Sequence, residues 1–307
     1  MTFTARGLYA SSSKEPRRRR FRWLWVGAVV ALVALLFGAV GALGAVPVGK
    51  EGETIGFENP EGLVVENRTG GSVTVTESGV GMLEVDSKLR HTLLNKAEST
   101  VDRDGDGVVR AEAGCNGAFG AACSVEYEIT VPAGTEVTVE TSSGEVELAG
   151  LTGPVRVDTV SGEVEASDLS GDADLRSTSG EIELSGATGN AVRAGTTSGE
   201  VDLEGVDVAE LEVESTSGSV GVEGGFDTAR LSSTSGSVEA EAARPFEKLT
   251  AETVSGSVEL RVPERRTYDV RTDSTSGSVE VDVPTDKGAE SLIEASTTSG
   301  SVEITGD

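Results

Sequence analysis

Apolar and polar positions alternate along most of the chain after residue 135, and the alternating runs recur at a regular spacing. Each recurrence is built around a Ser-Gly pair, as in TSSGEVEL (141–148) and STSGSVEV (274–281). The glycines of nine such pairs stand 18 to 23 residues apart, at positions 144, 162, 180, 199, 218, 236, 256, 277 and 300. An alternation with period two indicates strands, and self-similarity at a fixed period of this size is typical of a solenoid.

Each repeat predicts two short strands joined by a tight corner. After the corner, apolar residues stand two and four positions beyond the glycine, from Val146 and Leu148 in the first copy to Val302 and Ile304 in the last. A second alternating run precedes each corner, and we expect the apolar positions of both runs to face inward. The sequence therefore predicts an all-β fold, a single-stranded parallel β-solenoid of about nine or more coils of 18–23 residues.

The two corners of each coil differ in their sequence. The last inward position before every Ser-Gly pair is Ser or Thr, from Thr141 to Thr297, and its hydroxyl is expected to satisfy polar groups in the bend. The glycine is expected to supply a backbone conformation that other residues resist. At the opposite corner the gap between inward residues grows from six residues at 149–154 to eleven at 282–292, which predicts either an interacting loop edge or tolerated loop drift.

Two outward columns differ in charge. One alternates in sign along Arg156, Asp174, Arg193, Glu212, Arg230, Thr250, Arg271 and Glu294. The other is acidic and is interrupted once, by Gly221; its acids are Glu147, Glu165, Glu183, Asp202, Glu239, Glu259, Glu280 and Glu303. Two full charges about 4.8 Å apart repel by roughly 0.9 kcal/mol in water. The acidic column is interpreted either as a set of ligands that bridge divalent cations such as Ca²⁺ or as a solvated face.

The first fifty residues have a different composition. RRRRFR (17–22) precedes an uncharged run, which as a helix would be about 36 Å long and could span a hydrocarbon core of about 30 Å. The basic flank predicts a single-pass plasma-membrane protein with a cytoplasmic N-terminus and its C-terminal domain outside. A cleaved signal peptide is the alternative, because GALGA (41–45) offers small residues. The expected segments are a basic cytoplasmic segment (1–22), a transmembrane helix (23–46), a linker (47–60), an N-terminal β segment that forms first coils or a cap (61–134) and the solenoid (135–307).

The two cysteines, Cys115 and Cys123, lie close together in the N-terminal β segment. In an oxidising compartment this spacing predicts a small local structural disulfide. A metal site is the alternative, but the sequence offers no second cysteine pair or nearby histidine for it.

An acidic motif, DRDGDG (102–107), precedes these cysteines and carries Asp102, Asp104 and Asp106 at the spacing of a calcium-binding loop. The twelfth position of such a loop would be Ala113 rather than a bidentate Glu. The alternative to a metal site here is therefore an Asp-Gly turn within a hairpin.

Composition excludes several classes of function. Residues 51–307 carry 51 acidic residues against 17 basic ones, so nucleic acid is not expected as a partner. The chain has one histidine, His91, and its Ser-Gly pairs stand at equivalent corners rather than in a nucleophile motif. The sequence therefore predicts that the protein is not an enzyme and needs no cofactor, calcium aside.

The stretch VEYEITVPAGTEVTVETSSGEVELAGLTG (125–153), followed by repeated SGEVE or SGSVE, resembles the bacterial β-strand-repeat proteins of unknown function that are called "putative adhesins". The resemblance covers roughly residues 60–307. It implies a membrane-anchored β-solenoid, a place for some members in envelope-stress responses, and no catalytic residues.

Two functions are consistent with these features. The first is a surface-displayed, non-catalytic binding or adhesin-like module. It would be anchored in the membrane by its N-terminal helix and would bind an envelope component. The second is an envelope scaffold that self-associates through an uncapped C-terminal coil, with Val302 and Ile304 on an open strand edge.

Overall fold

The computed structural model describes residues 26–35, 47–92, 95–117 and 123–306, and the chain separates into two compact units, Met1–Val46 and Pro47–Asp307. In the first unit, residues 26–35 form a helix. Ten residues rise about 15 Å, half of a hydrocarbon core. Within these described residues no helix is long and apolar enough to cross a membrane.

This finding corrects one prediction from the sequence. The transmembrane helix expected over 23–46, and with it the single-pass plasma-membrane protein with its C-terminal domain outside, is wrong on the described structure. The described helix covers about half of the roughly 20 residues that a span requires. The basic segment 1–22 and, within the predicted helix, residues 23–25 and 36–46 lie outside the described residues.

The second unit consists of strands. They are β1 (Pro47–Glu58), β2 (Gly62–Asn67), β3 (Val73–Ser78), β4 (Met82–Thr92), β5 (Asn95–Arg103), β6 (Val108–Gly117), β7 (Ser124–Pro132), β8 (Glu136–Thr141), β9 (Val146–Ala149), β10 (Val155–Thr159), β11 (Val164–Leu169), β12 (Ala173–Ser177), β13 (Ile182–Thr196), β14 (Val201–Ser215), β15 (Val220–Ser235), β16 (Val238–Ala242), β17 (Lys248–Ser255), β18 (Val258–Val262), β19 (Tyr268–Ser276), β20 (Val279–Asp282), β21 (Ser291–Ser299) and β22 (Val302–Gly306).

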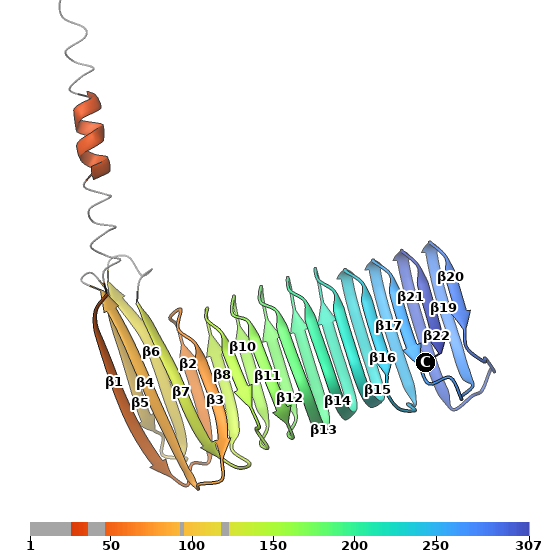
Figure 1. Cartoon of the computed structure of the whole chain (residues 1–307), viewed down its shortest axis with the longest axis horizontal. Helices are drawn as coiled ribbons and strands as arrows, with labels where there is room; N and C mark the ends of the chain where they lie inside the picture. The colour runs from red at the N-terminus through yellow and green to blue at the C-terminus, as the bar shows by residue number, and fades with distance from the viewer. Residues whose placement is uncertain (1–25, 36–46, 93–94, 118–122, 307) are drawn as a thin grey trace, which may run out of the picture. The chain divides into compact units, whose positions relative to one another are not determined.

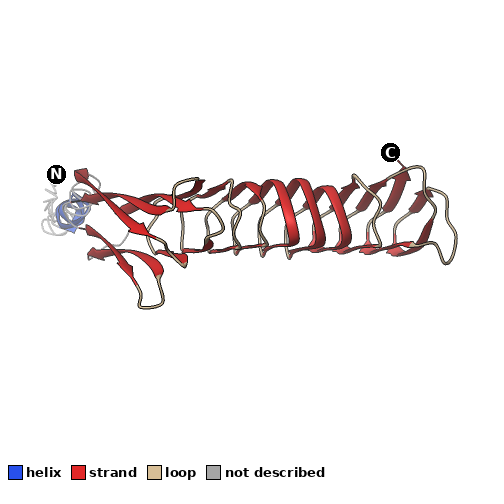
Figure 2. Ribbon diagram, turned by 90° about the horizontal axis from the view of Figure 1, so that it is seen from below, coloured by secondary structure: helices blue, strands red, loops and turns tan. Residues whose placement is uncertain are grey.

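These strands form a stack of coils, each of which gives one strand to each of two facing layers (Figure 2). In one layer the parallel neighbours follow the order β6, β2, β8, β10, β12, β13, β14, β15, β17, β21, β19. In the other they follow the order β7, β3, β9, β11, β13, β14, β15, β16, β18, β22, β20. The long strands β13, β14 and β15 turn the second corner and belong to both layers. The predicted all-β parallel solenoid is confirmed.

The core lies between the two layers and is built from the predicted inward positions. Val146 and Leu148 of β9 and Val157 of β10 are fully buried, as are their equivalents in the interior coils. Burial of each such side chain contributes about 1.5–3 kcal/mol. Because neighbouring coils supply most of this burial, the stability of one coil depends on the coil on either side of it.

The Ser-Gly corner is held by buried hydroxyls, as predicted. The Ser177 hydroxyl accepts a hydrogen bond from the amide of Gly180 at 2.7 Å, and the Thr253 hydroxyl donates to the carbonyl of Gly236 at 2.9 Å. The role expected for the glycines needs revision. Of the nine corner glycines, Gly144 and Gly300 alone have a positive φ, whereas a Cβ at Gly180 would overlap the Gly162 carbonyl of the next coil. Close approach between coils is therefore the main reason for glycine here.

The last two coils are stacked in inverted order. The final coil, β21 and β22, lies between the coil of β17 and β18 and the coil of β19 and β20 (Figure 1). Val302 and Ile304 are therefore fully buried, and the predicted open edge at these residues is wrong. The long connections 261–269 and 282–292 carry the chain past one coil position and back, which explains their length without a binding partner.

The other end of the solenoid is covered. The coil of β6 and β7 stacks outside that of β2 and β3, β4 pairs antiparallel with β7, and β1 pairs antiparallel with β4. The antiparallel strand β5 extends the layer that contains β6. Residues 47–58, expected in a linker, form β1. Cys115 in β6 and Cys123 just before β7 form the predicted disulfide, which ties the corner of this coil.

Candidate binding site

Two ladders of outward side chains follow from the register of the strands. The alternating ladder lies on the layer that contains β10, and its charges pair across coils. Arg156 lies 3.0 Å from Asp174, and Arg193 lies 3.3 Å from Glu212. In the inverted coils, Arg271 lies 3.2 Å from Glu294. Because these groups are partly exposed to solvent, each pair contributes about 0.2–1 kcal/mol.

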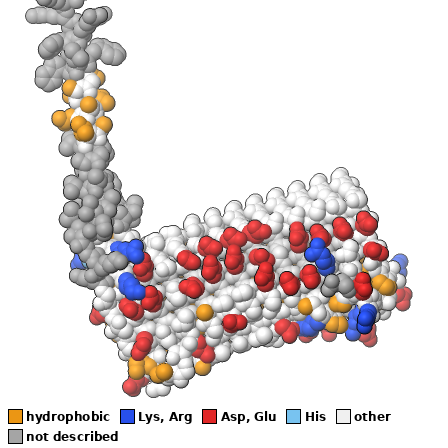
Figure 3. Space-filling model, in the orientation of Figure 1, with side chains coloured by type: hydrophobic (Ala, Val, Ile, Leu, Met, Phe, Trp, Pro, Cys, Tyr) orange, Lys and Arg blue, Asp and Glu red, His pale blue; other side chains and the backbone are white. Residues whose placement is uncertain are grey.

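The acidic ladder lies on the layer that contains β9. Its predicted members follow one another in the order Glu147, Glu165, Glu183, Asp202, Gly221, Glu239, Glu259, Glu303 and Glu280. Partial burial and the surrounding carboxylates raise the pKa of Glu165 and of Glu181 above the ordinary value of 4.5. Figure 3 shows acidic side chains in rows that cross successive coils on one face of the solenoid.

The carboxylates converge most closely at residues that the sequence analysis did not single out. Carboxylate oxygens of Glu163, Glu181 and Glu183 lie within 4.8 Å of one another. Glu163 and Glu181 directly follow the corner glycine, and the sequence signal for them is the change from SGE in the early repeats to SGS in the later ones. Cation binding by the acidic ladder stays a prediction.

The calcium-loop motif forms a hairpin turn between β5 and β6. The Asp104 amide donates to the Val108 carbonyl at 2.9 Å, and the Asp104 carboxylate lies 3.5 Å from Arg110. Among the described residues, one cluster of acidic side chains is close enough together to hold an ion. Asp102, Asp104 and Asp106 are not part of it. The geometry is that of an Asp-Gly turn, and metal binding at these three residues also stays a prediction.

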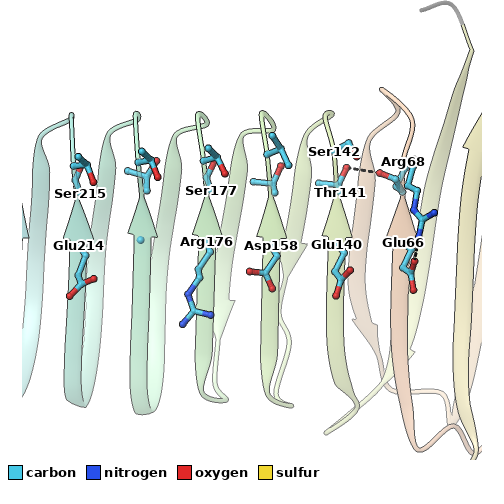
Figure 4. A pocket seen from close by; sticks show the side chains of 18 of the residues that line it. Glu66, Arg68, Glu140, Thr141, Ser142, Asp158, Arg176, Ser177, Glu214 and Ser215 are labelled. Atoms are coloured by element: carbon cyan, nitrogen blue, oxygen red, sulfur yellow. Dashed lines mark hydrogen bonds and ion pairs between the residues drawn. The ribbon is translucent and has the colours of Figure 1, made fainter. Parts of the chain in front are cut away.

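A third surface, here called the trough, is a shallow polar hollow of about 820 Å³ on the outer side of the layer that runs from β2 to β15 (Figure 4). Two adjacent outward columns line it. The first column is Glu66, Glu140, Asp158, Arg176, Gly195, Glu214 and Ser232. The second is Arg68, Ser142, Val160, Thr178, Thr197, Thr216 and Thr234. The trough thus presents a hydroxyl in five of the seven positions of the second column and a carboxylate in four of the seven positions of the first.

Two features shape the trough. Gly195 leaves a gap in the first column, where a Cβ would meet nothing closer than the Glu214 carbonyl at 3.8 Å. At the β2 end, Arg68 lies 3.0 Å from Glu66, and this ion pair is drawn in Figure 4. The sequence analysis did not find this site, because it depends on which outward columns lie side by side and on one missing side chain.

The corner hydroxyls bond to the backbone in eight of the nine repeats, and the Ser215 hydroxyl is buried without a hydrogen-bond partner among the described residues. The hydroxyl of Ser233 donates to the Gly218 carbonyl at 2.9 Å, and that of Ser274 donates to the Gly300 carbonyl at 3.0 Å. A nucleophilic hydroxyl needs a general base within hydrogen-bond reach, whereas these hydroxyls bond to the backbone. Because these contacts recur in successive coils, they give the repeated Ser and Thr residues a structural role.

Fold and surface together define a two-layered parallel β-solenoid with an open polar face. The chain matches the family described as Toastrack DUF4097 over residues 64–305, and it belongs to that family. It is similar to the crystal structure of a "putative adhesin" from Parabacteroides merdae, with 12% identity, a TM-score of 0.54, and 83% of this chain and 95% of that chain covered. A "putative adhesin" from Parabacteroides distasonis gives 12% identity, a TM-score of 0.53, and coverage of 83% and 97%. At this identity the likeness shows the fold. A search of curated proteins gives no match.

Proposed function

We propose that the protein is a non-catalytic, adhesin-like binding module whose ligand is an extended polysaccharide chain lying along the trough. The observation that carries this proposal is the repetition of hydroxyl and carboxylate groups at the coil spacing along one open surface. Family membership and the adhesin names of the structural neighbours support the class of function.

The chemistry of the trough favours a polyhydroxylated ligand. Side chains such as Thr197 and Thr216 offer a hydroxyl donor and acceptor each, and carboxylates such as Glu214 accept hydrogen bonds from sugar hydroxyls. The hollow is too open to enclose a small molecule, so affinity must come from many weak contacts along a chain. We therefore expect affinity to increase with ligand length.

The test uses neutral oligosaccharides of increasing length, from disaccharide to octasaccharide, in cello- and chito- series. Gly195→Leu fills the gap in the trough without strain, because Gly195 has no positive φ and open space beside it. The matched control is Ser296→Leu, at the same column position in β21 but outside the trough.

Calorimetric titration should show affinity that rises with length in the unsubstituted protein and in Ser296→Leu, and that falls at least tenfold in Gly195→Leu. The absence of binding at every length, or binding that Gly195→Leu leaves unchanged, would overturn the proposal.

A further inference from the structure

The trough carries six charged side chains, which are Glu66, Arg68, Glu140, Asp158, Arg176 and Glu214. Four of them already lie 2.9 or 3.0 Å from an opposite charge, either within the trough or beside it. The carboxylates of the other two, Glu140 and Glu214, have no ion pair or hydrogen bond with any residue in the ranges 47–92, 95–117 and 123–306, and both residues are exposed. Within these ranges the trough therefore holds two unpaired negative charges and no unpaired positive one.

The register of the strands fixes the distance between these two charges. Glu140, Asp158, Arg176, Gly195 and Glu214 are successive register partners in β8, β10, β12, β13 and β14. Four steps of about 4.8 Å place the Cα atoms of Glu140 and Glu214 about 19 Å apart. Figure 4 shows both side chains on the same face of the layer, with Arg176 between them. A ligand that meets both carboxylates must therefore be extended along the solenoid.

Each of the two carboxylates has a hydroxyl-bearing residue close to it in the chain. Ser142 and Thr216 stand two positions beyond Glu140 and Glu214, and both line the trough. An ammonium group has three donors and no acceptor, so a carboxylate, a hydroxyl oxygen and water can together satisfy it. Glu214 also borders the gap at Gly195, where a Cβ would meet nothing closer than 3.8 Å. A small cationic group thus finds charge, a hydrogen-bond acceptor and space.

We propose that the polysaccharide of the trough is one whose sugars carry free amino groups, and that Glu140 and Glu214 bind two protonated amines of the same chain. This inference rests on the proposed function and names the chemical class of its ligand. Between the two carboxylates, Thr178 and Thr197 supply hydroxyls as partners for the sugar hydroxyls. An anionic polysaccharide would instead meet two unpaired carboxylates and no free cation.

A cationic peptide fits the trough less well than an amino polysaccharide. An extended peptide binds a sheet by adding a strand to a free edge. Each strand beneath the trough, from β2 to β15, is instead paired with a neighbour on both of its sides. The trough therefore offers side chains only, and its row of hydroxyls has no counterpart along a peptide backbone.

The experiment titrates the full chain calorimetrically with the octasaccharides of glucosamine and of N-acetylglucosamine at pH 6, where amines are protonated and carboxylates are ionised. The readout is the ratio of the two affinities. We expect the glucosamine octasaccharide to bind at least tenfold more tightly. For the two disaccharides the ratio should fall below threefold, because a second contact adds affinity only when the ligand can span both sites.

Two variants test the residues. Glu140→Gln and Glu214→Gln should each reduce the octasaccharide ratio below threefold, and the ratio cancels any loss that a variant causes with both ligands. The matched control, Glu183→Gln, removes the same charge from the acidic ladder on the other layer and should leave the ratio unchanged. General attraction of a cation to a chain with a net charge of −27 would respond alike to all three variants.

The outcomes separate this inference from the proposed function. A ratio near one in the unsubstituted protein, or a ratio that Glu183→Gln lowers as much as Glu214→Gln does, overturns the inference. So does an octalysine peptide that binds more tightly than the glucosamine octasaccharide and loses affinity in Glu214→Gln, since the trough would then be a peptide site. Absence of binding throughout the N-acetyl series overturns the proposed function, whereas equal binding of the two octasaccharides overturns this inference alone.

Discussion

Two nearly identical stretches of sequence behave differently because of their neighbours. STSGSVEA (233–240) begins in β15 and ends in β16, where Val238 is fully buried between two coils. STSGSVEV (274–281) lies in β19 and β20, the coil at the end of the stack, where the equivalent Val279 is 44% exposed. The repeat therefore specifies the shape of a coil, and the stacking order decides whether that coil is core or edge.

The sharpest way to break this comparison is to place the same charge in both coils. Val238→Lys buries an unpaired ammonium between layers and should cost about 4 kcal/mol or more. Val279→Lys keeps its charge in water and should cost less than about 1 kcal/mol. Urea denaturation measures both free energies of unfolding. Equal losses would mean that Val279 is as buried as Val238.

The glycine ladder gives the next largest effect. Gly180→Ala forces its Cβ into the Gly162 carbonyl and should destabilise the fold by about 1–3 kcal/mol. Gly195→Ala has space and should stabilise it by about 0.5 kcal/mol, because alanine loses less backbone entropy on folding. Thermal unfolding of the two variants should thus shift in opposite directions. A destabilising Gly195→Ala would contradict the distinction between close approach and open surface.

The two charge ladders should respond to pH in opposite senses. Because the pKa values of Glu165 and Glu181 are raised, the folded state takes up protons before the unfolded chain does. The contribution of the acidic ladder to stability therefore grows as the pH falls through the raised pKa values toward 4.5. A hydrogen bond from Lys248 and the nearby charge of Arg271 lower the pKa of Glu294, so its contribution is present above 4.5 and is lost as the pH falls through the lowered value.

Single substitutions distinguish these two pH dependences of stability. Near neutral pH, Glu165→Gln should raise the melting temperature and Glu294→Gln should lower it, each by no more than the about 0.2–1 kcal/mol of exposed charge interactions. Melting temperatures between pH 4 and 8 would show the two slopes. The same sign for both variants would contradict the assignment of one ladder as repulsive and the other as balanced.

The smallest effect concerns cations on the acidic ladder. If the sequence-based prediction of bridging holds, calcium raises the melting temperature by more than sodium does at matched ionic strength. Glu163→Gln should remove part of that difference, because Glu163 belongs to the closest carboxylate group. If the two salts raise the melting temperature equally, the acidic ladder is a solvated face rather than a cation-binding site.

The sequence predicted what a coil looks like but not where each coil goes. Apolar alternation and the Ser-Gly period predicted the inward columns, the corner hydroxyls and both ladders. The order of the last two coils was not predictable from the repeats, since copies that share the same inward residues can stack in either order. The connections 261–269 and 282–292 were the one signal, and their length was consistent either with an interacting loop edge or with tolerated loop drift.

The candidate site shows the same limit. Each residue of the trough is visible as an outward position, yet the sequence does not show which outward columns lie side by side on one layer. Glu163 and Glu181 were missed because their convergence depends on the path of the corner. The N-terminal helix is described over residues 26–35 only, and hydropathy alone does not fix where a helix begins and ends.

The inverted stacking order is the central claim, and one cross-linking measurement tests it most directly. Glu259 and Glu303 are register partners in adjacent strands, whereas Glu280 lies one strand further out. The double variant Glu259→Cys with Glu303→Cys should therefore form an intramolecular disulfide. The variant Glu259→Cys with Glu280→Cys, with Cα atoms about 10 Å apart, should not. Peptide mapping that finds the second disulfide and not the first would contradict the inverted order.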